Sequence, residues 1–159
     1  MKLIRKTATA LAVLLAATVL PVAPAAAATA ERPAPPRSCL VAVDTGEATC
    51  YDSRADHTRA LNRLRGVRAE MGSLYSDANY QGARLTFHGT LGCYFQYPEF
   101  ADLSRYGWND IASSAQATAY CPSMSLYDHT WWAGDSMWFR AMEPWLRGLN
   151  DRISSVRLG

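Results

Sequence analysis

Two short patterns each occur twice in this chain, in the same order, and they constrain its fold more than any other feature. The first pattern is an aromatic residue, four residues, an aromatic residue, one residue and glycine, and it covers 75–82 and 127–134. The second pattern covers 109–114 (Asn-Asp-Ile-Ala-Ser-Ser) and 150–155 (Asn-Asp-Arg-Ile-Ser-Ser). Different patterns repeated in one order indicate an internal duplication.

The second pattern is rich in carboxylate, amide and hydroxyl oxygens. Calcium prefers six to eight such hard oxygen ligands in flexible geometry. The same residue types also make turns by bonding their own backbone, so the pattern alone is compatible with a purely structural role. The duplicated motif therefore suggests, without requiring, a pair of calcium sites.

The first thirty residues have the organisation of a secretory signal. A basic start is followed by an apolar stretch at 8–20 and a small-residue cleavage site at 28–30. The apolar stretch is shorter than the roughly 20 residues that a membrane span needs. We expect cleavage after Ala30, secretion, and no membrane attachment of the mature protein.

Removal of the signal changes the charge balance of the chain. The signal holds three of the 16 basic residues and none of the 14 acidic ones, so the mature chain carries a formal net charge of −1. The alkaline isoelectric point belongs to the precursor and gives no reason to expect nucleic-acid binding. We expect a monomer.

Four cysteines remain in the mature chain, and an even number in a secreted protein predicts disulfides. Three connectivities are possible. We favour Cys39–Cys50 with Cys93–Cys121, because the members of each pair lie within one compositional segment. A zinc site is disfavoured, since no Cys-x-x-Cys pair occurs and the three histidines are scattered.

Composition divides the mature chain into three parts. A proline-rich, disordered lead-in is expected at 31–37. Segment 38–72 predicts a disulfide-closed hairpin and a short helix that is capped by Asp52 or Ser53 and ends at Gly66. Short strands separated by Gly, Asn and Asp at 73–159 predict an all-β sandwich.

The two copies differ in length because the first carries a longer insertion at 91–107. This insertion contains Cys93 and an aromatic run from Tyr94 to Phe100. Long insertions in β domains often carry function. A partner surface is expected to include Gly92, Cys93, Tyr94 and Phe95, with Trp131 as a further candidate.

These repeats resemble the βγ-crystallin superfamily over about residues 72–159. Both its Greek-key pattern and its calcium signature (Asn/Asp-Asn/Asp-x-x-Ser/Thr-Ser) occur in both copies. The resemblance implies a two-motif Greek-key β-sandwich that binds two Ca²⁺ ions. A cysteine-containing lead segment before such a domain also resembles, more loosely, secreted actinobacterial proteins of the I36 peptidase-inhibitor family.

The resemblance also implies a set of calcium ligands shared between the two motifs. Hydroxyl ligands would come from Ser113 and Ser154, and side-chain oxygens from one member of each Asn-Asp pair. Main-chain carbonyls would complete each site. The residues concerned are Ala78, Asn109, Asp110, Ile111, Ser113, Thr130, Asn150, Asp151, Arg152 and Ser154.

Catalysis is not expected, because His57, His88 and His129 fall in no catalytic motif. Three non-catalytic functions are therefore considered. The first is a secreted calcium-binding module. The second is an inhibitor of secreted peptidases, including metallopeptidases, acting through a rigid loop at 92–97. The third is an antimicrobial protein that binds wall polysaccharide or chitin through a tryptophan cluster, in which Trp131 is the residue expected to be exposed. The cluster comprises Trp131, Trp132, Trp138 and Trp145.

Overall fold

A computed structural model describes residues 36–159 of the chain. The expected signal peptide at 1–30, and residues 31–35 of the expected lead-in, lie outside the described residues. Within 36–159, no helix combines the length and apolar character that a membrane crossing requires.

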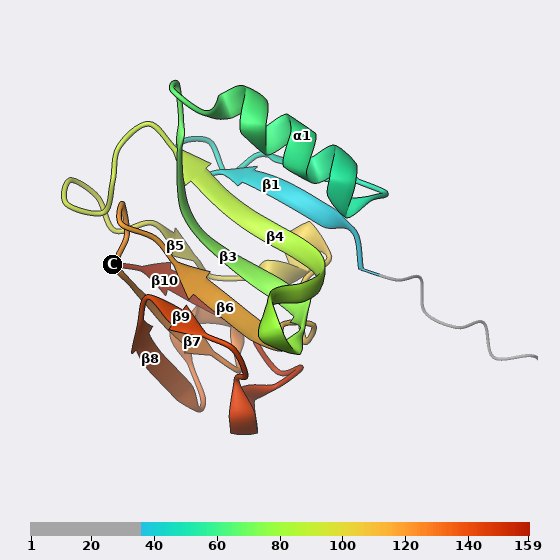
Figure 1. The fold of residues 1–159 in the computed structure, drawn as a ribbon. Helices are drawn as coiled ribbons and strands as arrows, with labels where there is room; N and C mark the ends of the chain where they lie inside the picture. The colour runs from blue at the N-terminus through green and yellow to red at the C-terminus, as the bar shows by residue number, and fades with distance from the viewer. Residues whose placement is uncertain (1–35) are drawn as a thin grey trace, which may run out of the picture. The chain divides into compact units, whose positions relative to one another are not determined.

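Two β-sheets make up most of the described chain (Figure 1). The larger has the strand order β2-β1-β4-β3-β6-β9 and the smaller β5-β10-β7-β8. The bounds in the larger sheet are β1 Ser38–Ala42, β2 Ala48–Tyr51, β3 Ala69–Asp77, β4 Gln81–Gly89, β6 Ser114–Ala117 and β9 Met142–Glu143. Those in the smaller sheet are β5 Glu99–Phe100, β7 Ser123–Tyr127, β8 Ser136–Arg140 and β10 Ser155–Leu158.

The chain order within the sheets is that of two Greek keys. Each motif places three strands in its own sheet and gives its third strand to the other sheet. In the first motif this strand is β5, which pairs with β10; in the second it is β9, which pairs with β6. The all-β Greek-key sandwich predicted from the duplicated patterns is confirmed, and the exchange of strands makes each motif depend on its partner.

Alternation of side chains along the strands explains how the two sheets form one core. On β7, Met124 and Leu126 are fully buried, whereas Ser125 and Tyr127 face outward. On β10, Val156 and Leu158 are buried in the same way. Period-two burial of this kind places one face of each sheet against the other.

The N-terminal segment extends the larger sheet. Strand β1 pairs antiparallel with β2 and parallel with β4, with Cys39 opposite Leu85. Cys39 and Val41 are part of the main core. The hairpin expected from the sequence is present, and it adds two strands to the sandwich. Strand β3 begins at Ala69, somewhat before the boundary at 73 that the sequence suggested.

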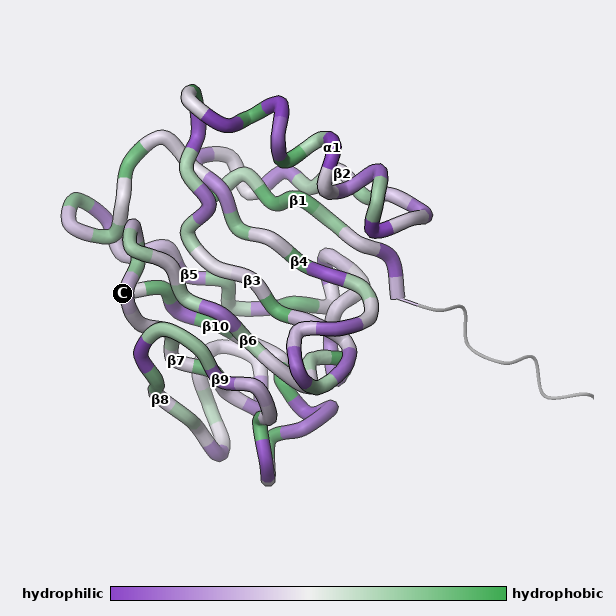
Figure 2. The backbone as a smooth tube through the Cα atoms, in the orientation of Figure 1, coloured by the Kyte–Doolittle hydropathy of each residue, from purple (hydrophilic) through white to green (hydrophobic). Residues whose placement is uncertain are grey.

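Helix α1, Arg54–Leu64, lies against the outside of this extended sheet (Figure 1). Ser53 caps its first turn by accepting a hydrogen bond from the backbone N–H of Asp56. Only His57 and Leu61, one turn apart, are buried. Figure 2 shows that the other residues of the helix are largely hydrophilic, so the narrow buried stripe of His57 and Leu61 is what positions the helix.

Three short 3₁₀ segments complete the loops that matter for the site: η1 Ala78–Tyr80, η3 Thr130–Trp132 and η4 Arg147–Leu149. A fourth, η2 Leu103–Tyr106, lies in the long insertion. Both cysteine pairs favoured from the sequence are present as disulfides, Cys39–Cys50 and Cys93–Cys121. The first closes the β1–β2 hairpin, and the second ties the insertion to the start of the second motif.

Candidate metal centre

The folded hairpin loop after β3 requires glycine, as does the corresponding loop after β7. Gly82 has a φ of +73°, and a Cβ there would lie 2.1 Å from Ser76 Oγ. Gly134 has a φ of +79°, and a Cβ would lie 1.9 Å from Asp128 Oδ1. Because each loop folds back over its own strand, only glycine fits both the space and the backbone conformation.

The last serine of each Ser-Ser pair clamps one of these loops. Ser114 Oγ donates to the carbonyl of Asp77 at 2.7 Å and accepts from the backbone N–H of Tyr80 at 3.0 Å. Ser155 repeats both bonds, donating to His129 O at 2.6 Å and accepting from the Trp132 N–H at 3.1 Å. Each hydroxyl is thus used once as donor and once as acceptor.

The other serine of each pair has a different environment. Ser113 Oγ lies 2.9 Å from the carbonyl oxygen of Ser76 and 2.7 Å from Oδ1 of Asp151. We name these three oxygens the first oxygen cluster. Its hydroxyl and carbonyl belong to the first motif and its carboxylate to the second, so the cluster joins the two motifs.

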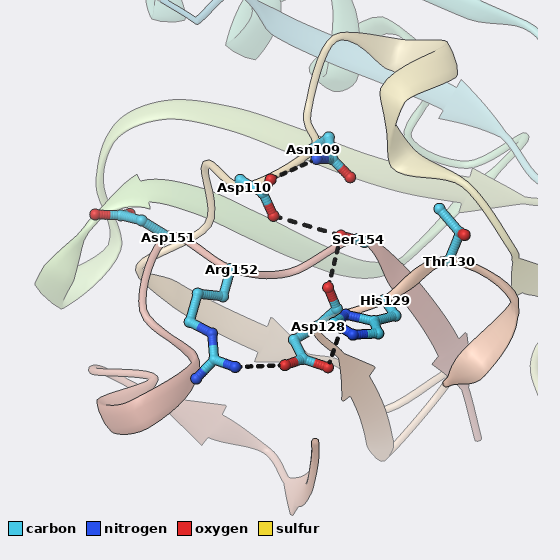
Figure 3. Close-up of a pocket in the computed structure, with 8 residues that line it drawn as sticks. All are labelled: Asn109, Asp110, Asp128, His129, Thr130, Asp151, Arg152 and Ser154. Atoms are coloured by element: carbon cyan, nitrogen blue, oxygen red, sulfur yellow. Dashed lines mark hydrogen bonds and ion pairs between the residues drawn. The ribbon is translucent and has the colours of Figure 1, made fainter. Parts of the chain in front are cut away.

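A second oxygen cluster is related to the first by the duplication. It consists of Ser154 Oγ, the carbonyl oxygen of Asp128 at 2.8 Å, and Asp110 Oδ1 at 3.4 Å (Figure 3). Here the hydroxyl and carbonyl come from the second motif and the carboxylate from the first. Each cluster therefore combines oxygens of both motifs. That these oxygens are metal ligands, as the sequence resemblance implies, stays a prediction.

Each cluster contains more acceptors than protons. A serine hydroxyl carries one hydrogen, so it can donate to the carbonyl or to the carboxylate but not to both. The clamp serines do not share this deficit, because each donates once and accepts once. Three oxygens held together around a single proton form an arrangement that a bound cation would stabilise.

The acidic member of each Asn-Asp pair is the one that crosses to the other motif. Asp110 and Asp151 both adopt left-handed backbone conformations, with φ of 56° and 54°. Their backbone N–H groups donate to Ile153 O and Ala112 O of the opposite motif. The preceding asparagines orient the carboxylates, since each side-chain amide donates to Oδ2 of the following aspartate, at 2.6 Å and 2.8 Å.

The two clusters differ in their charged surroundings. Where the first motif has Ser76, the second has Asp128, whose side chain is almost completely buried. The guanidinium of Arg152 lies 2.5 Å from Asp128 Oδ2, and His129 Nδ1 lies 3.3 Å from Oδ1 (Figure 3). The first motif has Ile111 in place of Arg152. The second cluster therefore already has an internal cation.

An open cavity of about 630 Å³ lies over the second cluster. The residues that line it include Asp110 and Asp151, the acidic residues of the two Asn-Asp pairs, together with Asp128 and Arg152 (Figure 3). Within residues 36–159, no three His, Cys, Asp or Glu side chains group in a way that could hold a metal ion. A cation at either cluster would depend on one carboxylate together with hydroxyl and carbonyl oxygens, which are the mixed donors calcium uses.

Several candidates from the sequence fit this arrangement, and others stay predictions. The structure brings together Ser113 with Asp151 and Ser154 with Asp110. The carbonyls that meet the two hydroxyls are those of Ser76 and Asp128, which were not among the expected ligands. They immediately follow the first aromatic residue of each repeat, and this register could have identified them. Thr130 lines the cavity; the proposed carbonyl ligands Ala78, Thr130, Ile111 and Arg152 stay predictions.

The expected partner surface lies elsewhere on the molecule. The loop after β4 exposes Tyr94 and Phe95, the latter with 80% of its surface accessible. The Cys93–Cys121 disulfide and a hydrogen bond from the Cys93 N–H to Tyr120 O at 2.8 Å anchor its base. Trp131 is also exposed, and its backbone N–H donates to Ala101 O at 2.8 Å.

The three histidines, scattered in the sequence, fall into two places in the structure: His57 and His88 lie near each other, and His129 lines the cavity over the second cluster. His57 lies on the buried side of α1 and is completely buried. Burial and the nearby Arg84 lower its pKa to about 4. Burial and the nearby Arg68 also lower the pKa of His88. Both side chains are therefore neutral at physiological pH, and neither lies at the candidate metal centre.

Comparisons with known proteins give structural neighbours only. No family model matches the sequence, and no curated protein matches it. Similar solved structures include a βγ-crystallin from Ciona intestinalis at 22% identity, TM-score 0.44, covering 55% of this chain and 98% of that chain. A βγ-crystallin domain from Flavobacterium johnsoniae matches at 26% identity, TM-score 0.42, covering 57% and 94%. One from Clostridium beijerinckii matches at 21% identity, TM-score 0.44, covering 56% and 97%.

Proposed function

We propose that this chain is a secreted, non-catalytic calcium-binding module of βγ-crystallin type that holds two Ca²⁺ ions between its motifs. One ion would bind at the first oxygen cluster and one at the second. The hydroxyl and carbonyl of one motif and the carboxylate of the other would hold each ion. Calcium would then link the two halves of the sandwich from both sides.

The observation that carries this proposal is the surplus of acceptors in both clusters. A serine that served only to fix a turn would be satisfied in the way that Ser114 and Ser155 are. Ser113 and Ser154 instead face two acceptors each, and one of these is a carboxylate. Few carboxylates serve each cluster, so affinity in the weaker range of extracellular modules, roughly 10⁻⁴ to 10⁻³ M, is expected.

Calorimetric titration of the mature protein with calcium tests this function. Asp151→Asn and Asp110→Asn each remove one charge at an exposed position and leave the shape of the side chain unchanged. Each should weaken one of two binding events by about tenfold or more, which is about 1.4 kcal/mol. Asp52→Asn, at an exposed carboxylate of the N-terminal segment, is the matched control and should bind as the wild type does.

The absence of binding heat, together with an unchanged melting temperature at millimolar calcium, would refute the proposal. Equal effects of all three substitutions would also contradict it, because they would indicate a nonspecific charge effect. Measuring thermal stability with and without calcium separates loss of binding from loss of fold. A variant that melts as the wild type without calcium, but gains less from calcium, has lost a ligand.

The two ions should not bind equally, because Arg152 places a positive charge beside the second cluster. Arg152→Ile gives the second motif the residue that the first motif has at this position. Removing the guanidinium frees the Asp128 carboxylate and raises the negative potential there. The weaker calcium affinity should increase in this variant, and the stronger one should not change.

A second candidate function, inhibition of a secreted peptidase, is supported by the loop at 92–97. Tyr94 and Phe95 project from a short segment whose base is fixed by a disulfide. A loop held in one conformation loses little entropy when it binds, which is the requirement for a loop inhibitor. Inhibition of a thermolysin-like enzyme by the wild type, lost in Phe95→Ala but retained in Trp131→Ala, would support this function; no inhibition by the wild type would refute it.

A further inference from the structure

The outer face of the smaller sheet carries one row of side chains across all four strands. Arg157 on β10 is opposite Glu99 on β5 and Ser125 on β7, and Ser125 is opposite Trp138 on β8. Directly opposed residues of antiparallel strands share a face of the sheet. At a strand spacing of about 4.8 Å, the row spans about 14 Å.

A groove of about 360 Å³ follows this row. We call it the Tyr97–Trp138 groove, after two aromatic residues that line it. Tyr97 and Trp138 have 72% and 63% of their surfaces exposed. Single exposed apolar residues are common on protein surfaces, but two strongly exposed aromatic rings beside one cavity are typical of a binding site.

Both aromatic residues are held in place by the backbone. The carbonyl of Pro98, the residue after Tyr97, accepts a hydrogen bond from the Leu158 N–H at 2.9 Å. Trp138 sits in the middle of β8, which pairs with β7 along five residues. Trp138 is therefore fixed in a paired strand, and Tyr97 lies at the end of the 92–97 loop, directly before the anchored Pro98. A ligand would thus meet a partly preformed site.

The floor of the groove is polar and small. Ser123 and Ser125 line it and are partly exposed, so their hydroxyls can donate to and accept from a ligand. Arg157 is fixed on both sides, by an ion pair of 2.8 Å with Glu99 and by stacking at 4.2 Å on the ring of Trp132. The opposite charges of Arg157 and Glu99 offset each other, so the residues lining the groove do not favour an ionised ligand.

We propose that the Tyr97–Trp138 groove binds a neutral oligosaccharide of pyranose rings. A pyranose has an apolar C–H face and a rim of hydroxyl groups. The exposed aromatic rings can pack against the apolar C–H face. The serine hydroxyls, Glu99 and Arg157 can form hydrogen bonds with the sugar hydroxyl groups. None of the residues of the calcium clusters, and neither Trp131 nor residues 92–95, line the groove, although Tyr97 belongs to the same loop as 92–95. The proposal does not depend on the proposed calcium function.

Calorimetry of the mature protein with chitohexaose, cellohexaose and maltohexaose tests the proposal. At least one of the three should bind in the range of about 1 mM or tighter. Trp138→Ala and Tyr97→Ala should each weaken that binding roughly tenfold, and Trp138→Phe should retain most of it. Trp131→Ala is the matched control, since this tryptophan is equally exposed but lies outside the groove.

Three results would overturn the proposal. The first is no binding of any of the three sugars by a wild type whose fold is verified by circular dichroism. The second is binding that Trp131→Ala abolishes and Trp138→Ala leaves unchanged, which would move the site. The third is a dimer in sedimentation velocity that Trp138→Ala dissociates, which would make this face an interface between two copies of the chain.

Discussion

Acid should destabilise this fold through one buried histidine. His57 is completely buried between α1 and the extended sheet, with the edge of the Tyr51 ring beside it. Burial, then the positive charges of Arg84, Arg54 and His88, lowers its pKa to about 4 from an ordinary value of 6.5; a backbone contact with Cys39 opposes this. The folded protein therefore disfavours the protonated imidazole.

The sign and size of the effect follow from proton linkage. Between pH 6.5 and about 4 the unfolded chain binds a proton at this position that the folded chain does not, so stability falls as the pH falls. With these two pKa values, the loss at about pH 5 is about 2 kcal/mol relative to neutral pH. Below the folded pKa the loss levels off at about 3.4 kcal/mol.

Urea unfolding of the wild type and of His57→Phe, near pH 7 and near pH 5, measures this loss directly. Phenylalanine keeps a ring against Tyr51 and removes the titration. The wild type should lose about 2 kcal/mol more than the variant between the two pH values. A difference below about 0.5 kcal/mol would refute the reasoning, because the imidazole would then be titrating as if it were exposed. His88→Phe serves as the comparison for the other buried histidine, whose pKa is also lowered.

Three further predictions concern the residues that shape the loops. Gly134→Ala should cost about 2 kcal/mol or more of stability, because it combines a φ of +79° with a clash; in thermal unfolding, Gly148→Ala, whose Cβ meets nothing within 4 Å, should be close to neutral. Replacing Cys93 and Cys121 together by serine should lower stability by about 3.6 kcal/mol on loop entropy for a separation of 28 residues, measured by chemical denaturation; a loss below about 1 kcal/mol would contradict this. Ser114→Ala removes the partner of the partly buried Asp77 carbonyl and Tyr80 N–H and should cost about 1 kcal/mol or more in the same assay, whereas an unchanged midpoint would show that the clamp does not hold the loop.

The sandwich could be predicted from the sequence because its determinants are local and occur twice. Gly82 and Gly134 mark loops that no other residue fits, and the serine pairs close those same loops. Strand alternation on β7 and β10 is also a short-range pattern. Each of these patterns is short in the sequence, although the serines bond loops 23 to 37 positions away. The duplication makes each pattern recognisable because it occurs a second time.

The position of the N-terminal segment could not be predicted, because it depends on partners far away in the sequence. Nothing within 38–51 indicates that β1 pairs in parallel with β4, more than forty residues later. The same applies to His57, which looks like an ordinary polar residue on a weakly amphipathic helix and becomes buried only through that pairing. Long-range strand pairing is decided by the assembled core and not by local propensity.

The candidate metal centre shows the same division between local and distant information. Ser113, Ser154 and the Asn-Asp pairs are identifiable because they recur in a fixed pattern. The ion pair of Arg152 with Asp128 is not, since both residues depart from the repeat and are 24 positions apart. Departures from a repeat carry no pattern to recognise, and only the folded structure shows that two of them meet.

The difference between adjacent serines explains how one motif can serve both fold and function. In each Ser-Ser pair the second hydroxyl is fully used in holding the loop, so the loop forms whether or not an ion is bound. The first hydroxyl, on the residue directly before the clamp serine, faces a carboxylate of the other motif. Because the clamp does not depend on the ligand, substitution of the first serine should reduce calcium affinity without unfolding the loop. Substitution of the second should reduce both, and this pattern distinguishes a binding site from a turn.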